Sequence, residues 1–336
     1  MAKKKERKIP EVLVFTDINN YPDDLASLVV LAYLSDRNLI NLRGIITELG
    51  TYEVRRRRAM YAKGALSSLG YPFARTVPGG DYDMIDEQVE NNYVETEFSK
   101  IFEQTGMTVH RSGTIFLQEY IKTVKEKNIF ILLNAPFADL GKYMKATHDT
   151  IAKKVKKIVV MGDVLEDKDE NGFYQPNLES FNFKYCKEAA RELFVYAQQK
   201  DIRMTIVPSK TVKSLQMDYS CLENIKKSKN PVYQQLLALK DEKNPTTMAY
   251  DMVSTLCLVD GVFKSGGGVI EKEEGSTLNV SFASIPDPQM MRDKFCEIFK
   301  EKLEPKVLSM DHLFRKKSDE ETTEVKTEQQ EAPQNV

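Results

Sequence analysis

Acidic side chains gather near the N-terminus, in the stretch Thr-Asp17-Ile-Asn-Asn-Tyr-Pro-Asp23-Asp24 that follows the apolar run Val12–Phe15. Asp17 leaves the end of a predicted buried strand, and Asp23 and Asp24 fall in the first turn of a predicted helix. Carboxylates that converge from a strand end and a helix start repel one another, so they need a cation or firm hydrogen bonds. A helix N-terminus offsets only part of this negative charge.

The acidic pair alone has two interpretations. Asp23 and Asp24 could simply cap a helix, because acids are common at that position. Once Asp17 is included, a hard-cation site is the better explanation: oxygen ligands select Ca²⁺ or Mg²⁺ over zinc, and the three histidines of the chain are not clustered. Asp251 opens an apolar helical segment much later in the chain, where its charge should lie near a buried surface or simply begin the helix.

Short apolar β-type runs alternate with helical patterns along most of the chain. The predicted strands are Val12–Phe15, Leu42–Thr47, Ile129–Leu133, Ile158–Met161 and Met204–Val207, and the predicted helices are Asp24–Leu34, Tyr52–Leu69, Asp139–Ala146 and Lys187–Gln199. This alternation predicts an α/β fold with a mostly parallel central sheet flanked by helices. Ligands bind beyond the carboxyl ends of such strands, where Asp17, Glu48, Asn134 and Asp163 are expected.

The composition is that of a soluble globular protein. Of the 336 residues, 41% are hydrophobic and 29% are charged, which excludes collagenous, wholly disordered and transmembrane classes. A net charge of −2 gives no field that would attract nucleic acid, and no membrane partner is expected. The basic N-terminus leads into no signal-peptide stretch, so we expect a cytoplasmic protein whose Cys186, Cys221, Cys257 and Cys296 are reduced.

The chain is predicted to consist of one domain with two charged ends. Residues 1–10 form a basic arm, residues 11–315 form the domain, and residues 316–336 form a disordered acidic tail. The basic run from Arg55 to Arg58 lies within a predicted helix. Consecutive helical residues point about 100° apart, so we expect a mostly solvated helix here and no nucleic-acid-binding stripe.

These landmarks together resemble the nucleoside hydrolase family. That family opens with a strand ending in an Asp and continues with an Asp-Asp pair at the start of a helix, as Asp17, Asp23 and Asp24 do here. Further similar segments occur in the same order over residues 12 to 280: Ile45–Gly50, Ile131–Leu140, Lys157–Gly162, Ser180–Asn182 and Tyr250–Asp251. The opening is most similar to a divergent nucleoside-hydrolase-like branch that reads Thr-Asp-Ile-x-Asn-x-Pro-Asp-Asp.

The resemblance implies a homo-oligomeric, calcium-dependent hydrolase that cleaves the N-glycosidic bond of a ribonucleoside or related N-riboside. By position, the metal ligands would be Asp17, Asp24, the backbone carbonyl of Asn134, and Asp251. Asp17 would also be the general base that deprotonates the attacking water. The substrate-binding residues would be Asp23, Asn177, Asn182 and Tyr250.

The sequence departs from the family pattern mainly in substrate recognition. Two extra residues separate Asp17 from Asp23, and Ser180 replaces a Glu that contacts the 5′ side of the sugar. Thr51 replaces an Asn, and Tyr250 replaces the His that assists the leaving base in purine-acting members. A phenol titrates near pH 10, so Tyr250 would be a poorer general acid than His near neutrality.

Two alternatives follow from these departures. The chain could be a non-catalytic protein that binds a metal and a sugar with the same pocket. It could also be a haloacid-dehalogenase-type phosphatase, with Asp17 as nucleophile and Asp163 and Asp167 as Mg²⁺ ligands. The phosphatase scheme requires a second acid where this chain has Asn19, and it leaves the other acids unexplained.

Overall fold

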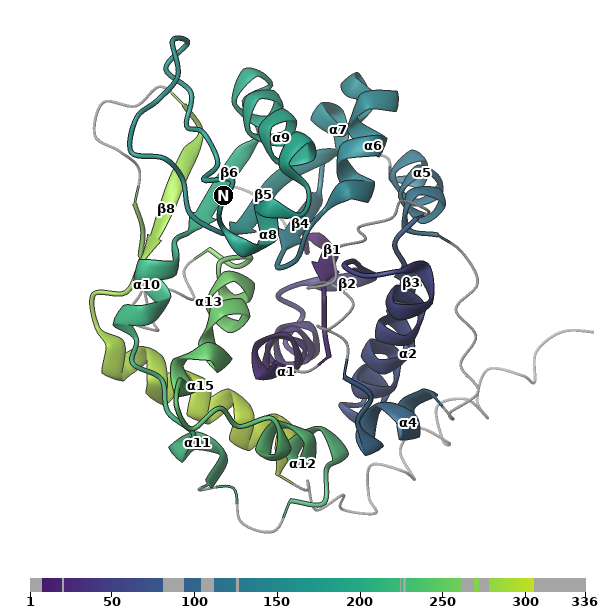
Figure 1. Ribbon diagram of the computed structural model, residues 1–336, viewed down its shortest axis with the longest axis vertical. Helices are drawn as coiled ribbons and strands as arrows, with labels where there is room; N and C mark the ends of the chain where they lie inside the picture. The colour runs from purple at the N-terminus through teal and green to yellow at the C-terminus, as the bar shows by residue number, and fades with distance from the viewer. Residues whose placement is uncertain are drawn as a thin grey trace, which may run out of the picture. The chain divides into compact units, whose positions relative to one another are not determined.

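A β-sheet forms the centre of the fold, with strand order β3-β2-β1-β4-β5-β6-β8-β7 (Figure 1). The strands are β1 (Glu11–Thr16), β2 (Asn41–Thr47), β3 (Arg75–Pro78), β4 (Ile129–Leu133), β5 (Val155–Met161), β6 (Arg203–Val207), β7 (Val269–Glu271) and β8 (Val280–Ser284). Neighbouring strands are parallel except for β7, which pairs antiparallel with β8 at the edge. The predicted mostly parallel sheet is therefore confirmed.

This architecture comes from a computed structural model that describes most of the chain. The described residues are 8–19, 21–80, 94–103, 112–124, 127–223, 225, 228–260, 269–271 and 278–304. Residues up to Glu304 form one compact unit. The predicted acidic tail and most of the basic arm lie outside the described residues, so both remain predictions. Within the described part, no helix is long and apolar enough to span a bilayer.

The sheet separates two hydrophobic cores because successive side chains of a strand point to opposite faces. In β1, Val12 and Val14 pack into one core, and Leu13 and Phe15 pack into the other. Both faces are buried, which explains why the central strands are continuous apolar runs without polar alternation.

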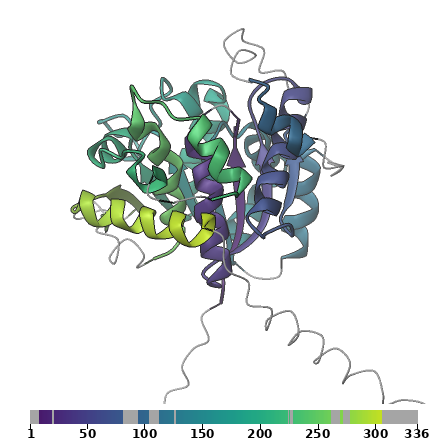
Figure 2. The ribbon, with the colours of Figure 1, turned by 90° about the horizontal axis from the view of Figure 1, so that it is seen from below.

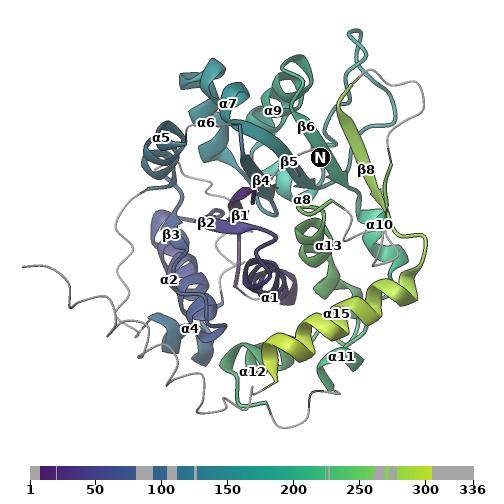
Figure 3. The same cartoon turned by 180° about the vertical axis from the view of Figure 1, so that it is seen from behind.

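Helices cover both faces of the sheet (Figures 1 and 3). One face is covered by α1 (Pro22–Asp36), α2 (Tyr52–Ser68), α4 (Glu97–Glu103), α10 (Ser209–Ser214), α11 (Ser220–Glu223), α12 (Pro231–Ala238), the 3₁₀ helix η1 (Pro245–Ala249), α13 (Tyr250–Leu256) and α15 (Pro288–Leu303). The other is covered by α5 (Gly113–Thr123), α6 (Ala138–Ala146), α7 (His148–Lys154), α8 (Phe181–Lys184) and α9 (Lys187–Gln199).

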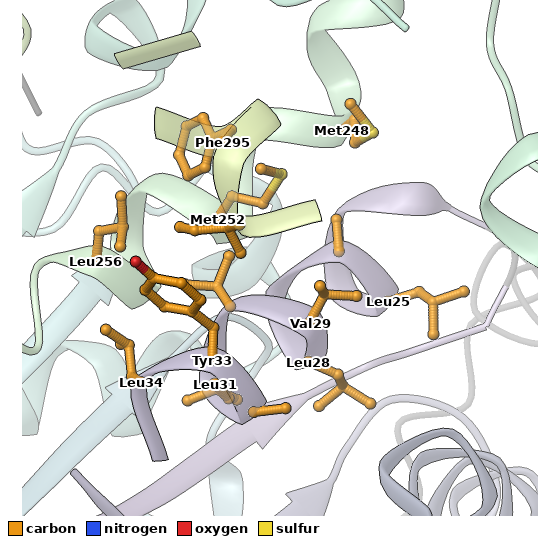
Figure 4. Close-up of a cluster of buried hydrophobic side chains, with 14 of the residues drawn as sticks. Leu25, Leu28, Val29, Leu31, Tyr33, Leu34, Met248, Met252, Leu256 and Phe295 are labelled. Carbon is orange, nitrogen blue, oxygen red and sulfur yellow. The ribbon is translucent and has the colours of Figure 1, made fainter. Parts of the chain in front are cut away.

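Helix α1 is buried around nearly its whole circumference, as its continuous apolar sequence requires. It packs against α13 and α15, and α15 lies on the side of α1 away from the sheet (Figures 1 and 2). Figure 4 shows Tyr33 of α1 beside Met252 and Leu256 of α13, with Phe295 of α15 nearby. This packing fixes the N-terminal turns of α1 and α13, which carry three of the predicted site aspartates.

Two sequence predictions on this side of the sheet are wrong. Cys221 and Cys296 form a disulfide between α11 and α15, so only Cys186 and Cys257 are free thiols. These two bonded cysteines are 75 residues apart in the chain, and no spacing motif in the sequence predicts that they pair.

The arginine run on α2 is also not mostly solvated. Arg56 and Arg57 are partly exposed and bond Glu53, but Arg55 and Arg58 are each 1% exposed. The Arg55 guanidinium donates to the carbonyl oxygens of Gly50 and Gly80, each at 2.6 Å. Backbone acceptors at strand ends thus satisfy buried arginines that the sequence alone placed in water.

Candidate active site

A cavity of about 420 Å³ opens at the carboxyl ends of β1, β4 and β5. The chain runs outward from β1 to β2 and β3, and then crosses to β4 on the opposite side of β1. Such a change of direction leaves a crevice in which α/β proteins bind ligands. The cavity is lined by Asp17, Tyr21, Asp23, Asp24, Asn134, Met161, Gly162, Ser180, Phe181, Asn182, Ser209, Asp241, Asn244, Thr247, Tyr250 and Asp251.

Carboxylates from three separated elements meet on the floor of this cavity. Asp23 and Asp24 lie in the first turn of α1, and Asp251 lies in the first turn of α13. One carboxylate oxygen from each of these three residues lies within 4.8 Å of the others. Asp17 follows β1 directly and interacts electrostatically with Asp23 and Asp24. The structure therefore brings together all four aspartates singled out from the sequence.

These acids are held in surroundings that oppose their ionisation. Burial, and then repulsion from Asp24, raises the pKa of Asp17 to about 8. Burial, with repulsion from a neighbouring aspartate, raises the pKa of Asp23 and that of Asp24 to about 7. The pKa of Asp251 is also raised well above its ordinary value, by burial first and then by repulsion from the other three. A cation would remove this repulsion and allow all four groups to ionise.

Hydrogen bonds fix the orientation of several of these groups. The Thr16 hydroxyl donates to Asp24 Oδ1. The Asp251 carbonyl accepts from the hydroxyls of Ser254 and Thr255 at 2.9 and 2.6 Å, and Ser254 Oγ also donates to Asn134 Oδ1 at 2.6 Å. These interactions connect the end of β1 to the start of α1, and the end of β4 to α13.

Asp23 Oδ1 is buried and has no hydrogen-bond partner among the described residues. A carboxylate oxygen without a partner, beside two further carboxylates, is a donor set suited to a hard cation. The oxygen-rich chemistry of this set fits Ca²⁺ or Mg²⁺, and it offers no nitrogen or sulfur ligand.

A buried arginine that the sequence interpretation did not assign to the site lies behind the acids. Arg58 Nη1 donates to the carbonyl oxygen of Ile18 at 3.1 Å, and its positive charge lowers the pKa of both Asp17 and Asp24. It offsets part of the charge of the cluster, although burial and repulsion still keep both pKa values raised.

The cavity lining also includes Asn182, at the start of α8. Asn182 Nδ2 donates to the carbonyl oxygen of Met161 at 3.2 Å, which fixes its carboxamide at the end of β5. Gly162 is needed there, because a Cβ at this position would come within 2.5 Å of the Phe183 ring. Tyr250 also lines the cavity, whereas Asn177 does not: its Oδ1 accepts from the backbone N–H of Glu179 at 3.1 Å.

The other polar residues predicted at strand ends have partners elsewhere. Glu48 is fully buried, and its Oε1 accepts from the Asp139 backbone N–H at 3.4 Å. The Asp163 carboxylate accepts from the backbone N–H and the hydroxyl of Ser209, both at 2.8 Å, and Asp167 is exposed. The phosphatase alternative, which needs Asp163 and Asp167 beside Asp17, is therefore not supported by this geometry.

Comparison with known proteins agrees with the architecture. The sequence matches no protein-family model and no curated protein sequence. Among solved structures, the type III effector protein XopQ complexed with adenosine diphosphate ribose aligns with a TM-score of 0.74 at 21% identity, covering 88% of this chain and 94% of its own. The effector protein XOO4466 aligns over the same shares with a TM-score of 0.77 at 22% identity.

An inosine-uridine preferring nucleoside hydrolase from Bacillus anthracis aligns over 87% of this chain and the whole of its own, with a TM-score of 0.58 at 12% identity. The chain has the nucleoside-hydrolase fold. Within this fold the acid cluster lies at the switch point between β1 and β4.

Several residues at the mouth of the cavity were not identified from the sequence: Tyr21, Phe181, Ser209, Asp241, Asn244 and Thr247. Tyr21, Asp241 and Asn244 lie in connections between elements, whose course has no local sequence signal. Thr255 and Ser254 were also missed, although their spacing of three and four residues from Asp251 places them on the same face of a helix.

Proposed function

We propose that this protein is a calcium-dependent hydrolase that cleaves the N-glycosidic bond of a ribonucleoside or a related N-riboside. The observation that carries the proposal is the group of three carboxylates, with Asp17 beside them, in a cavity at the switch point of a nucleoside-hydrolase fold. The neighbours of known structure include nucleoside hydrolases and an effector complexed with adenosine diphosphate ribose, and this supports a ribose-containing ligand.

Calcium would be held by Asp17, Asp24, Asp251 and the backbone carbonyl of Asn134, with Asp23 available beside them. When bound, it would leave coordination positions for a water and a vicinal diol, and it would make that water more acidic. The remaining steps belong to the chain. Asp17 accepts the proton of the attacking water, and Asp23 and Asn182 bond the sugar hydroxyls.

The negative charge of the cluster also suits the reaction. Cleavage of the C1′–N bond places positive charge on the ribose ring, in an oxocarbenium-like transition state. Carboxylates fixed in a partly dehydrated cavity stabilise this charge without having to reorient as it develops.

The test is turnover of inosine, uridine and other ribonucleosides, read by chromatography for the free base. Wild type, Asp17→Asn and Asp167→Asn are compared with calcium and with chelator. We expect calcium-dependent release, a loss of about 100-fold or more in kcat for Asp17→Asn because the general base is removed, and near-normal activity for Asp167→Asn. Full activity of Asp17→Asn would contradict the proposal, and an equal loss in Asp167→Asn would show that the loss is not specific to the acid cluster.

A second candidate function is binding without turnover. It is favoured by Ser180 and Tyr250, which line the cavity where the family resemblance expects a Glu and a His. Under this alternative, the calcium-loaded protein binds a riboside but releases no base from it. The same panel, supplemented by calorimetric titration of each riboside, separates the two functions.

A further inference from the structure

The cavity has a buried floor and an open mouth. On the floor, Asp24 is 6% exposed and Asn134 and Asp251 are each 3% exposed. At the mouth, Tyr21 is 50% exposed and Phe181 is 42% exposed. If the ribose lies over the acids of the floor, as the proposed function requires, its leaving group lies at the mouth.

Asp241 adds a fifth carboxylate to the lining, on the segment that precedes η1. Its Oδ1 accepts from the backbone N–H groups of Lys243 and Asn244 at 3.0 and 3.1 Å, and its own N–H donates to the Tyr219 hydroxyl at 2.8 Å. These bonds fix the carboxylate in place. Asp241 forms no ion pair with any residue that the structure describes, so none of the described side chains neutralises its charge.

Among the lining residues that the structure describes, no positive side chain balances these acids. These sixteen residues include five aspartates and no Lys, Arg or His. Arg58 is not among the described lining residues, and its guanidinium donates a hydrogen bond to the Ile18 carbonyl oxygen. A bound divalent cation carries two positive charges against these five aspartates, so it would neutralise only part of their negative charge. The mouth therefore attracts a positive group and repels a phosphate.

The same lining bears on how a leaving group departs. When a neutral nucleoside is cleaved, the ring nitrogen takes the bonding electrons and must also receive a proton. In an N-ribosylpyridinium cation, the electron pair of the breaking C1′–N bond cancels the positive charge of the ring, which leaves as a neutral molecule. Water supplies the oxygen that bonds to C1′, and its proton passes to Asp17 and then to solvent. No proton donor is needed at the mouth.

We propose that the preferred ligands of this cavity are N-ribosides with a cationic aromatic leaving group and no phosphate, and that Asp241 is the residue that determines this specificity. This inference rests on the proposed function of the site. The exposed rings of Tyr21 and Phe181 suit it further, because aromatic faces attract planar cations.

The test compares three ligands of nearly equal shape by calorimetry on the calcium-loaded protein. Nicotinamide riboside is cationic, its reduced dihydro form is neutral, and nicotinamide mononucleotide adds a 5′-phosphate. Titrations in the Asp17→Asn background prevent consumption of the ligand. We expect the cation to bind at least about tenfold more tightly than either of the other two, the factor expected for one unpaired charge near a protein surface.

Asp241→Asn should reduce the preference for the cation over the neutral form by about tenfold. The matched control is Glu242→Gln, since Glu242 is the exposed neighbour and does not line the cavity. Its preference should equal that of the parent protein. Equal binding of the cationic and neutral forms, tighter binding of the phosphorylated ligand, no binding of any ligand, or an unchanged preference in Asp241→Asn would each overturn the inference.

Turnover distinguishes failure of this inference from failure of the proposed function. Hydrolysis of inosine or uridine without a preference for the cation would support the proposed hydrolase and contradict the proposed specificity. A preference for the cation that depends on Asp241, together with no hydrolysis of any riboside, would support the proposed specificity and contradict the proposed hydrolase activity.

Discussion

Buried charged residues lie at both ends of helix α13, but the two groups differ in the charges of their neighbours. At the N-terminal end, Asp251 meets Asp23, Asp24 and Asp17, and burial together with repulsion from at least one of the others raises the pKa of each of the four. Just beyond the C-terminal end, the fully buried Lys157 donates to the Cys257 carbonyl oxygen and pairs with Asp260 at 3.1 Å.

The C-terminal cluster is complete within the protein. Asp260 also pairs with Arg203 at 2.7 Å, and the Cys257 carbonyl at the end of α13 is a favourable partner for the ammonium group of Lys157. The N-terminal cluster contains only like charges, with Arg58 as a partial offset. Buried charge that finds its own partners supports the fold, whereas buried charge that lacks them indicates a missing ligand.

The largest expected effect distinguishes the two clusters by ligand binding. Asp251→Asn removes one charged oxygen ligand, so calcium affinity measured by calorimetry should fall at least about 100-fold. The calcium-free protein should become no less stable, because the substitution relieves repulsion between the carboxylates. Asp260→Asn should leave calcium affinity unchanged. Equal calcium affinity in wild type and Asp251→Asn would show that the acid cluster is not the calcium site.

The second effect is a pH dependence that only the acid cluster produces. The aspartates titrate near pH 4 in the unfolded chain but near pH 7 to 8 in the folded one, so the folded state binds more protons between these values. The calcium-free protein should therefore be most stable near pH 4 to 5 and lose about 1.4 kcal/mol per pH unit for each excess proton as the pH rises to 8.

Calorimetric melting in chelator at pH 5, 6, 7 and 8 measures this slope. Calcium should flatten it, because the ion binds the deprotonated carboxylates and stabilises the folded state most at high pH. Asp251→Asn should reduce the slope in chelator. A melting temperature that rises steadily from pH 5 to pH 8 without calcium would contradict the raised pKa values.

The smallest effect concerns the paired cluster. Asp260→Asn deprives the buried Lys157 of its charged partner, and we expect a loss of about 1–2 kcal/mol in urea unfolding, moderated because Asp260 is half exposed and the Cys257 carbonyl remains. Glu188→Gln breaks an exposed ion pair with Lys145 and should leave the urea midpoint nearly unchanged, because solvent screens the pair. Equal losses in the two variants would remove the distinction between buried and exposed pairing.

The five central strands β1, β2, β4, β5 and β6 could be predicted closely because strands buried on both faces must be apolar along their length. Ile129–Leu133 and Lys187–Gln199 have the bounds expected from the sequence, and the β1 and β6 runs differ by only one or two residues. The pairing of Cys221 with Cys296 could not be predicted, since it depends on how α11 and α15 pack.

The site residues also include some that the sequence could predict and some that it could not. Asp17, Asp23 and Asp24 are close in sequence, so local reasoning brought them together. Asn134 and Asp251 were singled out by their positions at a strand end and a helix start, and the family resemblance added their roles as metal ligands. Asp241 and Arg58 were missed because the first lies in an irregular connection and the second appeared to be a solvated helix residue. Their positions depend on long-range packing that no local pattern encodes.

The most direct test of the central claim is the initial rate of base release measured against free calcium, alongside calorimetric occupancy of the ion. The ligands are inosine, uridine and nicotinamide riboside. The account predicts that one calcium binds per chain, that the rate for at least one riboside follows this occupancy, and that chelator abolishes it. Base release that persists in chelator, or a fully occupied calcium site with no release from any riboside, would contradict it.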